Sequence, residues 1–364
     1  MIRFSLRNFL VAIVIMSVPI VYTSIKWHQS RAESLAIKRL EEISQLEFFL
    51  YDYQLPGEGR TDIYASPPGP EFLRRILGKH FFARVKFLHI RTLSQENLQI
   101  LKRFPRLQFL DITDCSGLTS LSELRGADNL KGLELGACPS LKSIGVIDKW
   151  KLRDLTIKHC DSLTSIEGLQ GLSQLQRLEI TIPENCELDG IGTLNKLESL
   201  ALNCFGTIEN FELAKLAAPQ ISILDLRGDS IVDLNGINEF HNLEKLYLKQ
   251  CQLQSLCPAK SLPKLKFLHL SDCPLLTGSD LVGFSGLRKL SLWYCLDELD
   301  YIASLKDLEA ISFFAFNHPI SFDWVLEMKN LKEINFSSCH RVKAREDEIR
   351  KLFKRRLPSA KVSL

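Results

Sequence analysis

Blocks of apolar residues recur twelve times along this chain between Val85 and Ile334, at intervals of 21 to 24 residues. Within a block, further apolar residues follow the opening one after three and five positions, as in Leu107, Leu110 and Ile112. Because the side chains of a strand alternate between its two faces, the second and third apolar residues point to the same side. Each block is therefore predicted to be one strand with a return segment. Stacking the units buries a core that no single unit could bury.

The period of the repeat identifies the architecture. The blocks open at Val85, Leu107, Leu130, Leu152, Leu175, Leu197, Ile221, Leu243, Leu265, Leu287, Leu308 and Leu331. A period in this range is typical of a leucine-rich-repeat solenoid. We therefore predict an α/β fold: a leucine-rich-repeat solenoid, or horseshoe, of about twelve repeats with a parallel β-sheet on its concave face. An N-terminal transmembrane helix and terminal caps complete the expected fold.

Most of the cysteines share one position in the repeat, three residues after the last apolar residue of the strand. These are Cys115, Cys138, Cys160, Cys251, Cys273, Cys295 and Cys339. We interpret them as a ladder of buried thiols that donate weak hydrogen bonds to the turn backbone. Disulfides and a metal site are the alternatives. The chain has no Cys-x-x-Cys pair, and pairing of neighbouring thiols would distort a regular stack.

Two stretches of the chain resemble known families. The run from Cys160 to Leu169, like that from Cys115 to Leu121, resembles bacterial leucine-rich-repeat proteins and, more loosely, the Cys-containing repeats of plant receptor and F-box proteins. Ala36–Leu40, Tyr51–Tyr53 and Pro70–Gly78 resemble the N-terminal part of membrane-associated leucine-rich-repeat proteins of planctomycete bacteria. Both resemblances imply the fold. Neither implies an activity, because one solenoid fold serves many partners.

The N-terminal segment predicts a membrane anchor. Phe9 to Ile25 carries no charge, lies between Arg7 and Lys26, and is near the short end of the range for a spanning helix. We predict an uncleaved single-pass signal anchor, with the N-terminus inside and the solenoid on the extracytoplasmic side of the membrane. A cleaved signal peptide and a buried soluble helix are the alternatives, although no Ala-x-Ala site follows the run.

Both ends of the solenoid are expected to be covered. Before the repeats, the pattern predicts a charged helix over Gln29–Ile43, a short strand over Glu47–Gln54, and a helix from Pro70-Glu71 to Gly78. After them it predicts a helix over Arg341–Arg356 and a final strand. The basic residues of that helix are interpreted as a solvated face, with membrane-surface or nucleic-acid binding as the alternative. The predicted domains are an anchor at 1–28, a linker helix and N-terminal capping region at 29–84, the solenoid at 85–340 and a C-terminal cap at 341–364.

Composition and motifs argue against catalysis. The 46 basic and 43 acidic residues give a net charge of +3, which does not favour a dedicated nucleic-acid binder. The sequence lacks an H-E-x-x-H motif, a Walker A loop and a G-x-S-x-G elbow. His89 and His269 fall on concave positions eight units apart, too distant for a shared metal. We therefore expect no enzyme, no cofactor and no metal.

Recognition is then the function to look for, and it is expected on the concave positions two, four and six residues after each opening residue. Middle units place small or polar residues there, such as Ser199, Ala201 and Asn203. Units eight to eleven place aromatics beside cations, a composition typical of interface anchors. The predicted ligand-binding residues are Lys245, Tyr247, Lys249, Phe267, His269, Lys289, Trp293 and Phe314. The alternative is that these aromatics only pack on one another.

These expectations combine into one functional hypothesis. The chain is predicted to be a non-catalytic, membrane-anchored scaffold, a monomeric solenoid whose concave face binds a protein partner and no nucleic acid. An adaptor or substrate receptor of an enzyme complex, as in F-box proteins, is one alternative, although no F-box-like helical module precedes the repeats. An exported effector and a cell-envelope glycan-binding protein are others.

Overall fold

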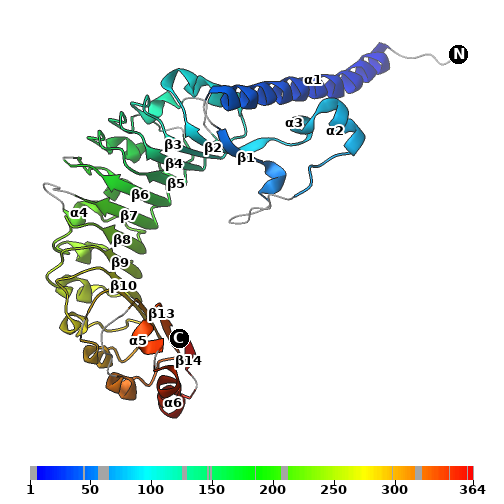
Figure 1. Ribbon diagram of the computed structural model, residues 1–364. Helices are drawn as coiled ribbons and strands as arrows, with labels where there is room; N and C mark the ends of the chain where they lie inside the picture. The colour runs from blue at the N-terminus through cyan, green and yellow to red at the C-terminus, as the bar shows by residue number, and fades with distance from the viewer. Residues whose placement is uncertain are drawn as a thin grey trace.

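One sheet runs through the whole molecule. In the computed structural model, the described residues are 6–43, 46–55, 65–124, 129–145, 147, 150–184, 186–205, 212–296, 298–315, 322–343, 345–358 and 360–363. Their strands are β1 (Leu46–Tyr51), β2 (Val85–Thr92), β3 (Phe109–Asp114), β4 (Gly132–Ala137), β5 (Asp154–Ile157), β6 (Arg177–Ile182), β7 (Ser199–Cys204), β8 (Ile223–Arg227), β9 (Lys245–Lys249), β10 (Phe267–Ser271), β11 (Lys289–Trp293), β12 (Ala310–Phe314), β13 (Glu333–Ser337) and β14 (Lys361–Ser363). They lie side by side in sequence order and curve into an arc (Figure 1).

Helices lie at the two ends and in the return segments. The α-helices are α1 (Leu6–Ile43), α2 (Glu71–Leu77), α3 (Lys79–Phe82), α4 (Leu213–Leu216), α5 (His340–Lys343) and α6 (Glu346–Arg356). Short 3₁₀-helices occupy Asp52–Gln54, Gln95–Arg103, Leu121–Glu123, Glu167–Gly171, Ile191–Thr193, Ile237–Glu239, Cys257–Ser261, Gly278–Leu281, Asp300–Ser304 and Asp323–Glu327. Most of these lie in the return segments between consecutive parallel strands.

The twelve predicted repeat strands are confirmed as β2 to β13. Each is parallel to the next, and only β1 is antiparallel to its neighbour among the described strands. β9 shows the alternation: Leu246 and Leu248 are fully buried, whereas Lys245, Tyr247 and Lys249 face the opposite side. The same outward offsets in every strand build the concave face, because neighbouring strands pair residue by residue.

A recurrent turn ends many of the strands and places the cysteine ladder. Gln250 and Asp272 have positive φ angles of 55° and 51°, and their N–H groups donate to the carbonyls of Ser271 and Trp293 at 2.8 and 3.0 Å. The next residue then points inward. Cys251 Sγ donates to the Leu226 carbonyl at 3.5 Å, and the other ladder cysteines are also buried and not joined in disulfides. The prediction of buried ladder thiols is confirmed.

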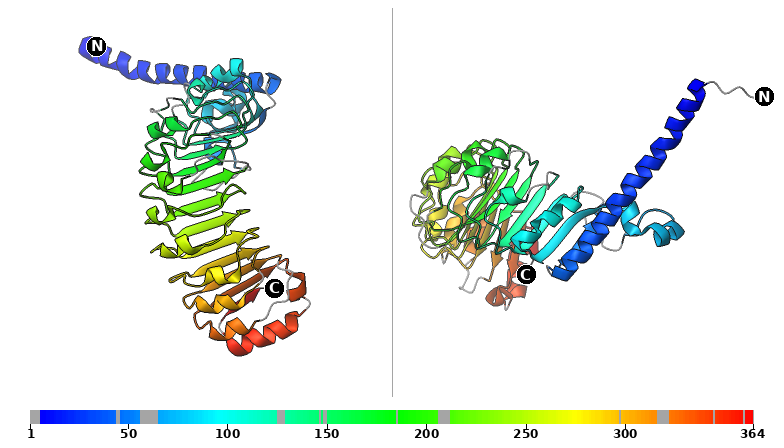
Figure 2. Two further views of the ribbon diagram at one scale, coloured as in Figure 1. Left: turned by 90° about the vertical axis from the view of Figure 1, so that its left-hand side faces the viewer. Right: turned by 90° about the horizontal axis from the view of Figure 1, so that it is seen from above.

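The N-terminal helix is one continuous element. α1 includes both the uncharged run Phe9–Ile25 and the predicted charged helix Gln29–Ile43, and it projects beyond the solenoid (Figure 2). Its second half packs against the first repeat through Ala36, Ile37 and Leu40, which are buried at helical spacing. A boundary near Gln29 was expected, yet no Gly or Pro lies between Pro19 and Ile43 to end the helix there.

The prediction of a single-pass membrane anchor, and with it a membrane localisation, is wrong. Among the described residues, no helix has the length and apolar character needed to cross a membrane. At about 1.5 Å per residue, the 17 residues of Phe9–Ile25 span roughly 26 Å, less than the ~30 Å hydrocarbon core. Thr23 and Ser24 lower the apolar character of the run further.

A buried ion pair fastens α1 to the start of the solenoid. Arg84 Nη1 donates to Glu33 Oε1 at 3.4 Å, while Nη2 donates to the Lys26 carbonyl and to Gln29 Oε1, each at 3.2 Å. Glu33 is fully buried and Arg84 nearly so. Burial raises the pKa of Glu33 to about 7, although Arg84 acts to lower it. The charge of Arg84 is therefore what makes a buried carboxylate tolerable at this position.

The structure also tests four predictions about the two ends of the solenoid. The strand before the repeats is confirmed as β1, and α2 begins after Pro70 and ends at Gly78, whose φ of 78° suits glycine. The single C-terminal helix predicted over Arg341–Arg356 is wrong, because α5 and α6 are separate helices. Two acidic residues in the first turn of α6, Glu346 and Asp347, favour a new helix start there. β14 then pairs with β13.

Candidate functional site

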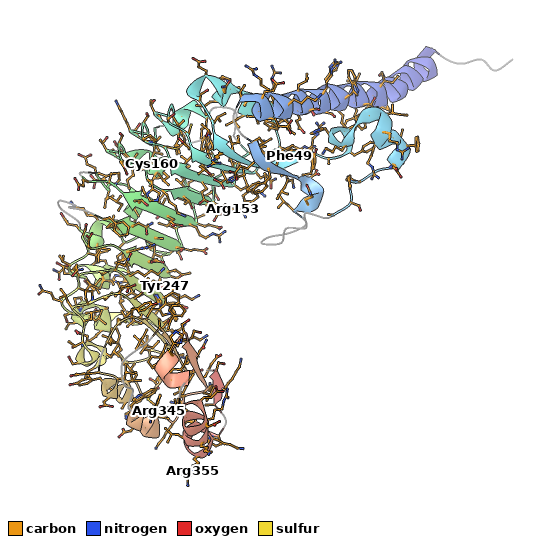
Figure 3. All side chains as sticks on the ribbon, viewed as in Figure 1. Phe49, Arg153, Cys160, Tyr247, Arg345 and Arg355 are labelled. Atoms are coloured by element: carbon orange, nitrogen blue, oxygen red, sulfur yellow. The ribbon has the colours of Figure 1, made fainter. Side chains whose placement is uncertain are left out.

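The predicted ligand-binding residues come together on four neighbouring strands of the concave face. The pairing of β9 to β12 aligns them in three rows that cross the strands. The first row is Lys245, Phe267, Lys289 and Ala310; the second is Tyr247, His269, Ser291 and Ser312; the third is Lys249, Ser271, Trp293 and Phe314. We call Tyr247, Phe267, His269, Trp293 and Phe314 the aromatic cluster. Figure 3 labels Tyr247 midway along the arc.

The rings of the aromatic cluster form one continuous chain of contacts. The centroid of Tyr247 lies 5.0 Å from that of Phe267 and 5.7 Å from that of His269. His269 is 5.1 Å from Trp293 in an edge-on arrangement, and Trp293 is 4.6 Å from Phe314. These separations are those of attractive aromatic pairs. The rings therefore hold one another in place, so the surface they offer is preorganised.

His269 is a support for the cluster rather than an exposed contact. Only 5% of the residue is exposed, because the rings of Tyr247 and Trp293 flank it, and Nδ1 lies 3.0 Å from Ser291 Oγ. Burial, with a smaller contribution from Lys249, lowers the pKa of His269 to about 4. The imidazole is consequently neutral near pH 7. Because the neighbouring rings cover it, His269 offers little surface to a ligand, and its role as a ligand contact stays a prediction.

The cations differ in how they are held. Lys249 Nζ lies 2.6 Å from Asp225 Oδ2 and 5.2 Å from the ring centroid of Tyr247. Burial and the charge of Asp225 raise the pKa of the Tyr247 hydroxyl, so Tyr247 stays a neutral hydrogen-bonding group. Lys245 and Lys289 instead are exposed at the starts of their strands. A partner can therefore contact the ammonium groups of Lys245 and Lys289 directly.

Sequence reasoning missed some residues that shape this surface. Asp225 occupies a concave position one unit before the predicted set, so applying the same offsets to β8 would have found it. Tyr294 is 57% exposed and its ring contacts Phe314 at 6.1 Å. It lies seven residues after Leu287, at the left-handed turn position with a φ of 49°, outside the three concave offsets. Its contribution follows from the turn geometry rather than from strand alternation.

The other half of the concave face is dominated by ion pairs. Lys158 Nζ lies 3.5 Å from Glu134 Oε1 and 3.2 Å from Glu179 Oε1, so one cation bridges carboxylates on both neighbouring strands. Burial acts to lower the pKa of Lys158, but Glu179 and Glu134 raise it above its usual value. Arg177 pairs with Asp154 in the same region. In this part of the face, basic and acidic side chains on neighbouring strands neutralise one another.

His89 belongs to that self-paired region. Nδ1 lies 2.6 Å from Asp111 Oδ2, Nε2 lies 3.0 Å from Glu47 Oε2, and the ring of Phe48 stacks on the imidazole at 5.1 Å. His89 stands on β2 and His269 on β10, so the structure does not bring the two histidines together. Within the part of the chain that the structure describes, no group of three or more His, Cys, Asp or Glu residues has the arrangement of a metal site.

Solved structures share the architecture at low sequence identity. The TLR13–ssRNA13 complex matches with a TM-score of 0.53 and 20% identity, over 68% of this chain and 38% of that one. An internalin (inlF) from Listeria monocytogenes matches with a TM-score of 0.48 and 18% identity, over 65% and 69% of the two chains. A leucine-rich-repeat protein from Leptospira interrogans matches at 0.31 and 18%, over 73% and 92%. No protein-family model matches the chain.

The strand geometry and the match to the TLR13 chain agree on one point. This protein has a leucine-rich-repeat fold. Of the solved structures, the TLR13 chain, at 20% identity and a TM-score of 0.53, shares the fold with this protein and shows no more than that. The resemblance to planctomycete proteins finds no counterpart among them. What the solenoid recognises must be argued from its own surface.

Proposed function

We propose that this protein is a non-catalytic recognition protein whose concave face binds another protein through the aromatic cluster. The observation that carries the proposal is the contrast within the face: cross-strand ion pairs in one half, a preorganised aromatic surface flanked by the exposed Lys245 and Lys289 in the other. Protein interfaces concentrate their binding energy in such aromatic anchors, with charged groups around them.

The partly exposed rings can contribute to binding as well as to packing within the aromatic cluster. Trp293 is 39% exposed and Tyr294 57%, although both have aromatic neighbours. Large side chains that are ordered but accessible lose little conformational entropy on binding. Lys245 and Lys289 add positive charge, so a partner with acidic residues around an apolar patch fits this surface best.

Site-directed cross-linking in the full-length protein tests the proposal. A photoactivatable phenylalanine analogue replaces Tyr294, beside the aromatic cluster, or Val232, which is 55% exposed in the return segment after β8. The proposal predicts a discrete protein adduct from position 294 and none of the same mass from position 232. Trp293→Ala should remove the adduct at 294, because it takes away the adjacent anchor.

Other outcomes separate the alternatives. A protein adduct formed only from position 232 would place the interface elsewhere. Retention of cell-envelope glycan on immobilised protein, lost in Tyr247→Ala and without any protein adduct at 294, would replace the protein partner by a carbohydrate. The solved TLR13 complex contains an RNA. Adducts with RNA at 294 that nuclease removes would favour that class instead.

A further inference from the structure

The first row of the concave face places one cation on each side of a ring. Lys245 on β9 is in register with Phe267 on β10, and Phe267 is in register with Lys289 on β11. Neighbouring strands lie about 4.8 Å apart, so the two lysines are separated by two strand spacings, about 9.6 Å. Both lysines are exposed, and Phe267 is half-buried between them. A ligand that lies along this row therefore meets a cation, a ring and a second cation at a fixed interval.

The charge changes sign farther along the same row. The pairing of β11, β12 and β13 puts the exposed Glu333 two strands beyond Lys289, and Lys361 Nζ lies 3.9 Å from Glu333 Oε1. In the other direction, two strands before Lys245, the row has the neutral Ser199. Two anionic groups at this interval therefore match the row, whereas a third would meet a carboxylate or a hydroxyl.

The interval between the lysines selects among the backbone conformations of a bound polypeptide. A polyproline II helix has three residues per turn and rises about 3.1 Å per residue, so residues i and i+3 lie on one side, about 9.3 Å apart. In a β-strand, residues i and i+2 share a face but are only about 6.7 Å apart, and residue i+3 points to the other face. In an α-helix, residues on one side are about 6 Å or about 10.5 Å apart, four or seven positions along. The polyproline II helix is therefore the closest match.

The rings beside the lysines supply the other contacts that a polyproline II helix needs. The ring of Tyr247, in the second row, lies 5.0 Å from that of Phe267, and both residues are half-buried. Aromatic surfaces bind proline-rich segments because such segments already have the polyproline II conformation and lose little entropy on binding. The helix has no internal hydrogen bonds, so its carbonyls can accept from the Tyr247 hydroxyl or from the indole N–H of the partly exposed Trp293. The same surface thus offers charge, apolar contact and hydrogen-bond donors.

We propose that the aromatic cluster, together with Lys245 and Lys289, binds a polyproline II segment with two acidic residues three positions apart, of the type Glu-Pro-Pro-Glu. The inference rests on the proposed function, because it names the part of a protein partner that the cluster recognises. One side of the segment carries the two carboxylates and pairs with the lysines. A second side carries prolines and packs on Phe267 and Tyr247, while the third side faces solvent. The ion pairs fix the register of the segment, and the rings provide most of the binding energy.

Fluorescence anisotropy of labelled peptides with the full-length protein tests the proposal. The probe is Pro-Pro-Glu-Pro-Pro-Glu-Pro-Pro. The control, Pro-Pro-Pro-Glu-Pro-Glu-Pro-Pro, has the same composition and net charge, but its carboxylates lie on different sides of the helix. At physiological salt the probe should bind saturably and about tenfold more tightly than the control, because only one carboxylate of the control can meet a lysine. A third glutamate at the same interval should change the affinity by less than about threefold, because the row has no third cation there.

Charge reversal shows whether the two lysines contact the segment. Lys245→Glu with Lys289→Glu should weaken binding of the probe about a hundredfold, and the variant should bind Pro-Pro-Lys-Pro-Pro-Lys-Pro-Pro, which should not bind to the wild-type protein. This gain of binding requires a folded variant, so loss of folding cannot produce it.

The matched control is Lys266→Glu. Lys266 is exposed and precedes Phe267, but it lies just before the start of β10, with Nζ 3.1 Å from Glu244 Oε1. Because the segment lies along the first row, this change should alter the affinity for the probe by less than about threefold. A loss as large as that of the double variant would overturn the assignment to the first row.

Four further results would overturn the proposal. They are equal affinities for the probe and the control peptide, no binding of the basic peptide by the folded double variant, a gain of more than about threefold from the third glutamate, and tighter binding of an alanine-rich helical peptide with glutamates seven residues apart. The third result would show that only total charge matters, and the last would assign the surface to an α-helix of the partner.

These outcomes are separate from the test of the proposed function. If a protein adduct forms from position 294 and persists in Lys245→Glu with Lys289→Glu, while the probe does not bind, the face recognises a protein by another kind of segment. If the wild-type protein gives no adduct from position 294, the proposed function itself fails, whatever the peptides do.

Discussion

The two halves of the solenoid have the same strand architecture, but they expose different side chains on the concave face. From β2 to β6 the concave face carries cations and carboxylates paired across neighbouring strands, as at Lys158 with Glu134 and Glu179. From β9 to β12 the same positions carry aromatic rings in contact with one another, among them Tyr247 and Trp293. Strand register and buried leucines are alike in both halves. Core positions therefore fix the fold, while outward positions are free to differ and hence to carry recognition.

The edge of the sheet shows the reverse contrast. There the amino-terminal half has a groove whose lining residues include Lys86 and Arg106 and none that is acidic. The groove of the carboxyl-terminal half has Glu309 and Asp307 among its cations. Because repeats contact only their neighbours, the two surfaces can evolve and be altered separately. The predictions below test first the shared scaffold and then the differences.

The largest expected effect concerns the thiols that both halves contain. Cys257 is exposed, and the other nine cysteines, Cys160 and Cys273 among them, are buried. Burial raises the pKa of Cys204 and of Cys295 to about 12, so their thiolates are scarce as well as inaccessible. Native protein should react once with an alkylating reagent, and the remaining sites about 10³-fold more slowly or less, because they require local unfolding. Mass spectrometry over time measures this. Rapid labelling of Cys160 or Cys273 in folded protein would contradict it.

Core truncation should be equally costly in the two halves. Leu155 on β5 and Leu268 on β10 occupy the same inward position and are buried. Changing either to Ala should lower the free energy of unfolding by about 2–5 kcal/mol, measured by chemical denaturation. The outward Thr156→Ala should change it by less than about 0.5 kcal/mol. A cost near zero for one leucine and not the other would mean that the halves do not share one scaffold.

The N-terminal ion pair predicts a pH dependence. The pKa of Glu33 rises to about 7 from an ordinary 4.5 on folding, so the folded state holds its proton more tightly. This contribution therefore lowers stability as pH rises from about 4.5 to 7, by at most on the order of 3 kcal/mol, and is constant above. The pKa values of His80 and His269, lowered to about 4, act oppositely: they stabilise the fold above pH 6.5 and lose that effect as pH falls towards 4.

The substitution Glu33→Gln separates the contribution of Glu33 to the pH dependence of stability from that of the histidines. The variant keeps an acceptor for Arg84 but no longer titrates. Its unfolding free energy should lack the Glu33 contribution, which declines between pH 4.5 and 7, while the histidine contribution remains. The difference between the two stability curves, measured by denaturation across that range, isolates Glu33. A pH-independent difference would show that the carboxyl titrates normally and that burial does not control it.

The smallest effect should come from the concave ion pairs. Lys158→Gln removes the cation between Glu134 and Glu179, and should lower the unfolding free energy by about 1 kcal/mol or less, because the groups are partly exposed. The loss should shrink further in high salt. Thr156→Ala, two residues away on the same face, is the control. A cost of several kcal/mol would mean that this half is built around its charges rather than around its leucines.

Much of the fold follows from local pattern. The opening residues of the repeat located β2 to β13, and the cysteine position predicted the buried ladder, because both depend on a period that neighbouring units reinforce. The length of α1 could not be predicted from local pattern. An uncharged run and a charged run differ in composition, yet nothing in the backbone between Lys26 and Gln29 ends a helix.

Surface detail depended on contacts between units. The eight predicted residues lie at outward positions of β9 to β12, and their binding role stays a prediction. The burial of His269 results from the rings on the adjacent strands. The groove lined by Lys86, Lys131 and Arg153 was missed for a related reason. Its residues lead into the strands, outside the concave offsets, and Lys86, Lys131 and Arg153 are each about one or two repeats apart in sequence. Such a site becomes apparent only when the units are stacked.

The most direct test of the central claim compares partner affinity for two variants at the same repeat position. Trp293 and Asn203 both lie six residues after the opening leucine of their units, one in the aromatic half and one near the middle of the face. With the partner captured from position 294, Trp293→Ala should weaken binding by about 2 kcal/mol or more, roughly thirtyfold in Kd, while Asn203→Ala leaves it unchanged. Equal affinities for the two variants, or a loss confined to Asn203→Ala, would contradict the assignment of recognition to the aromatic cluster.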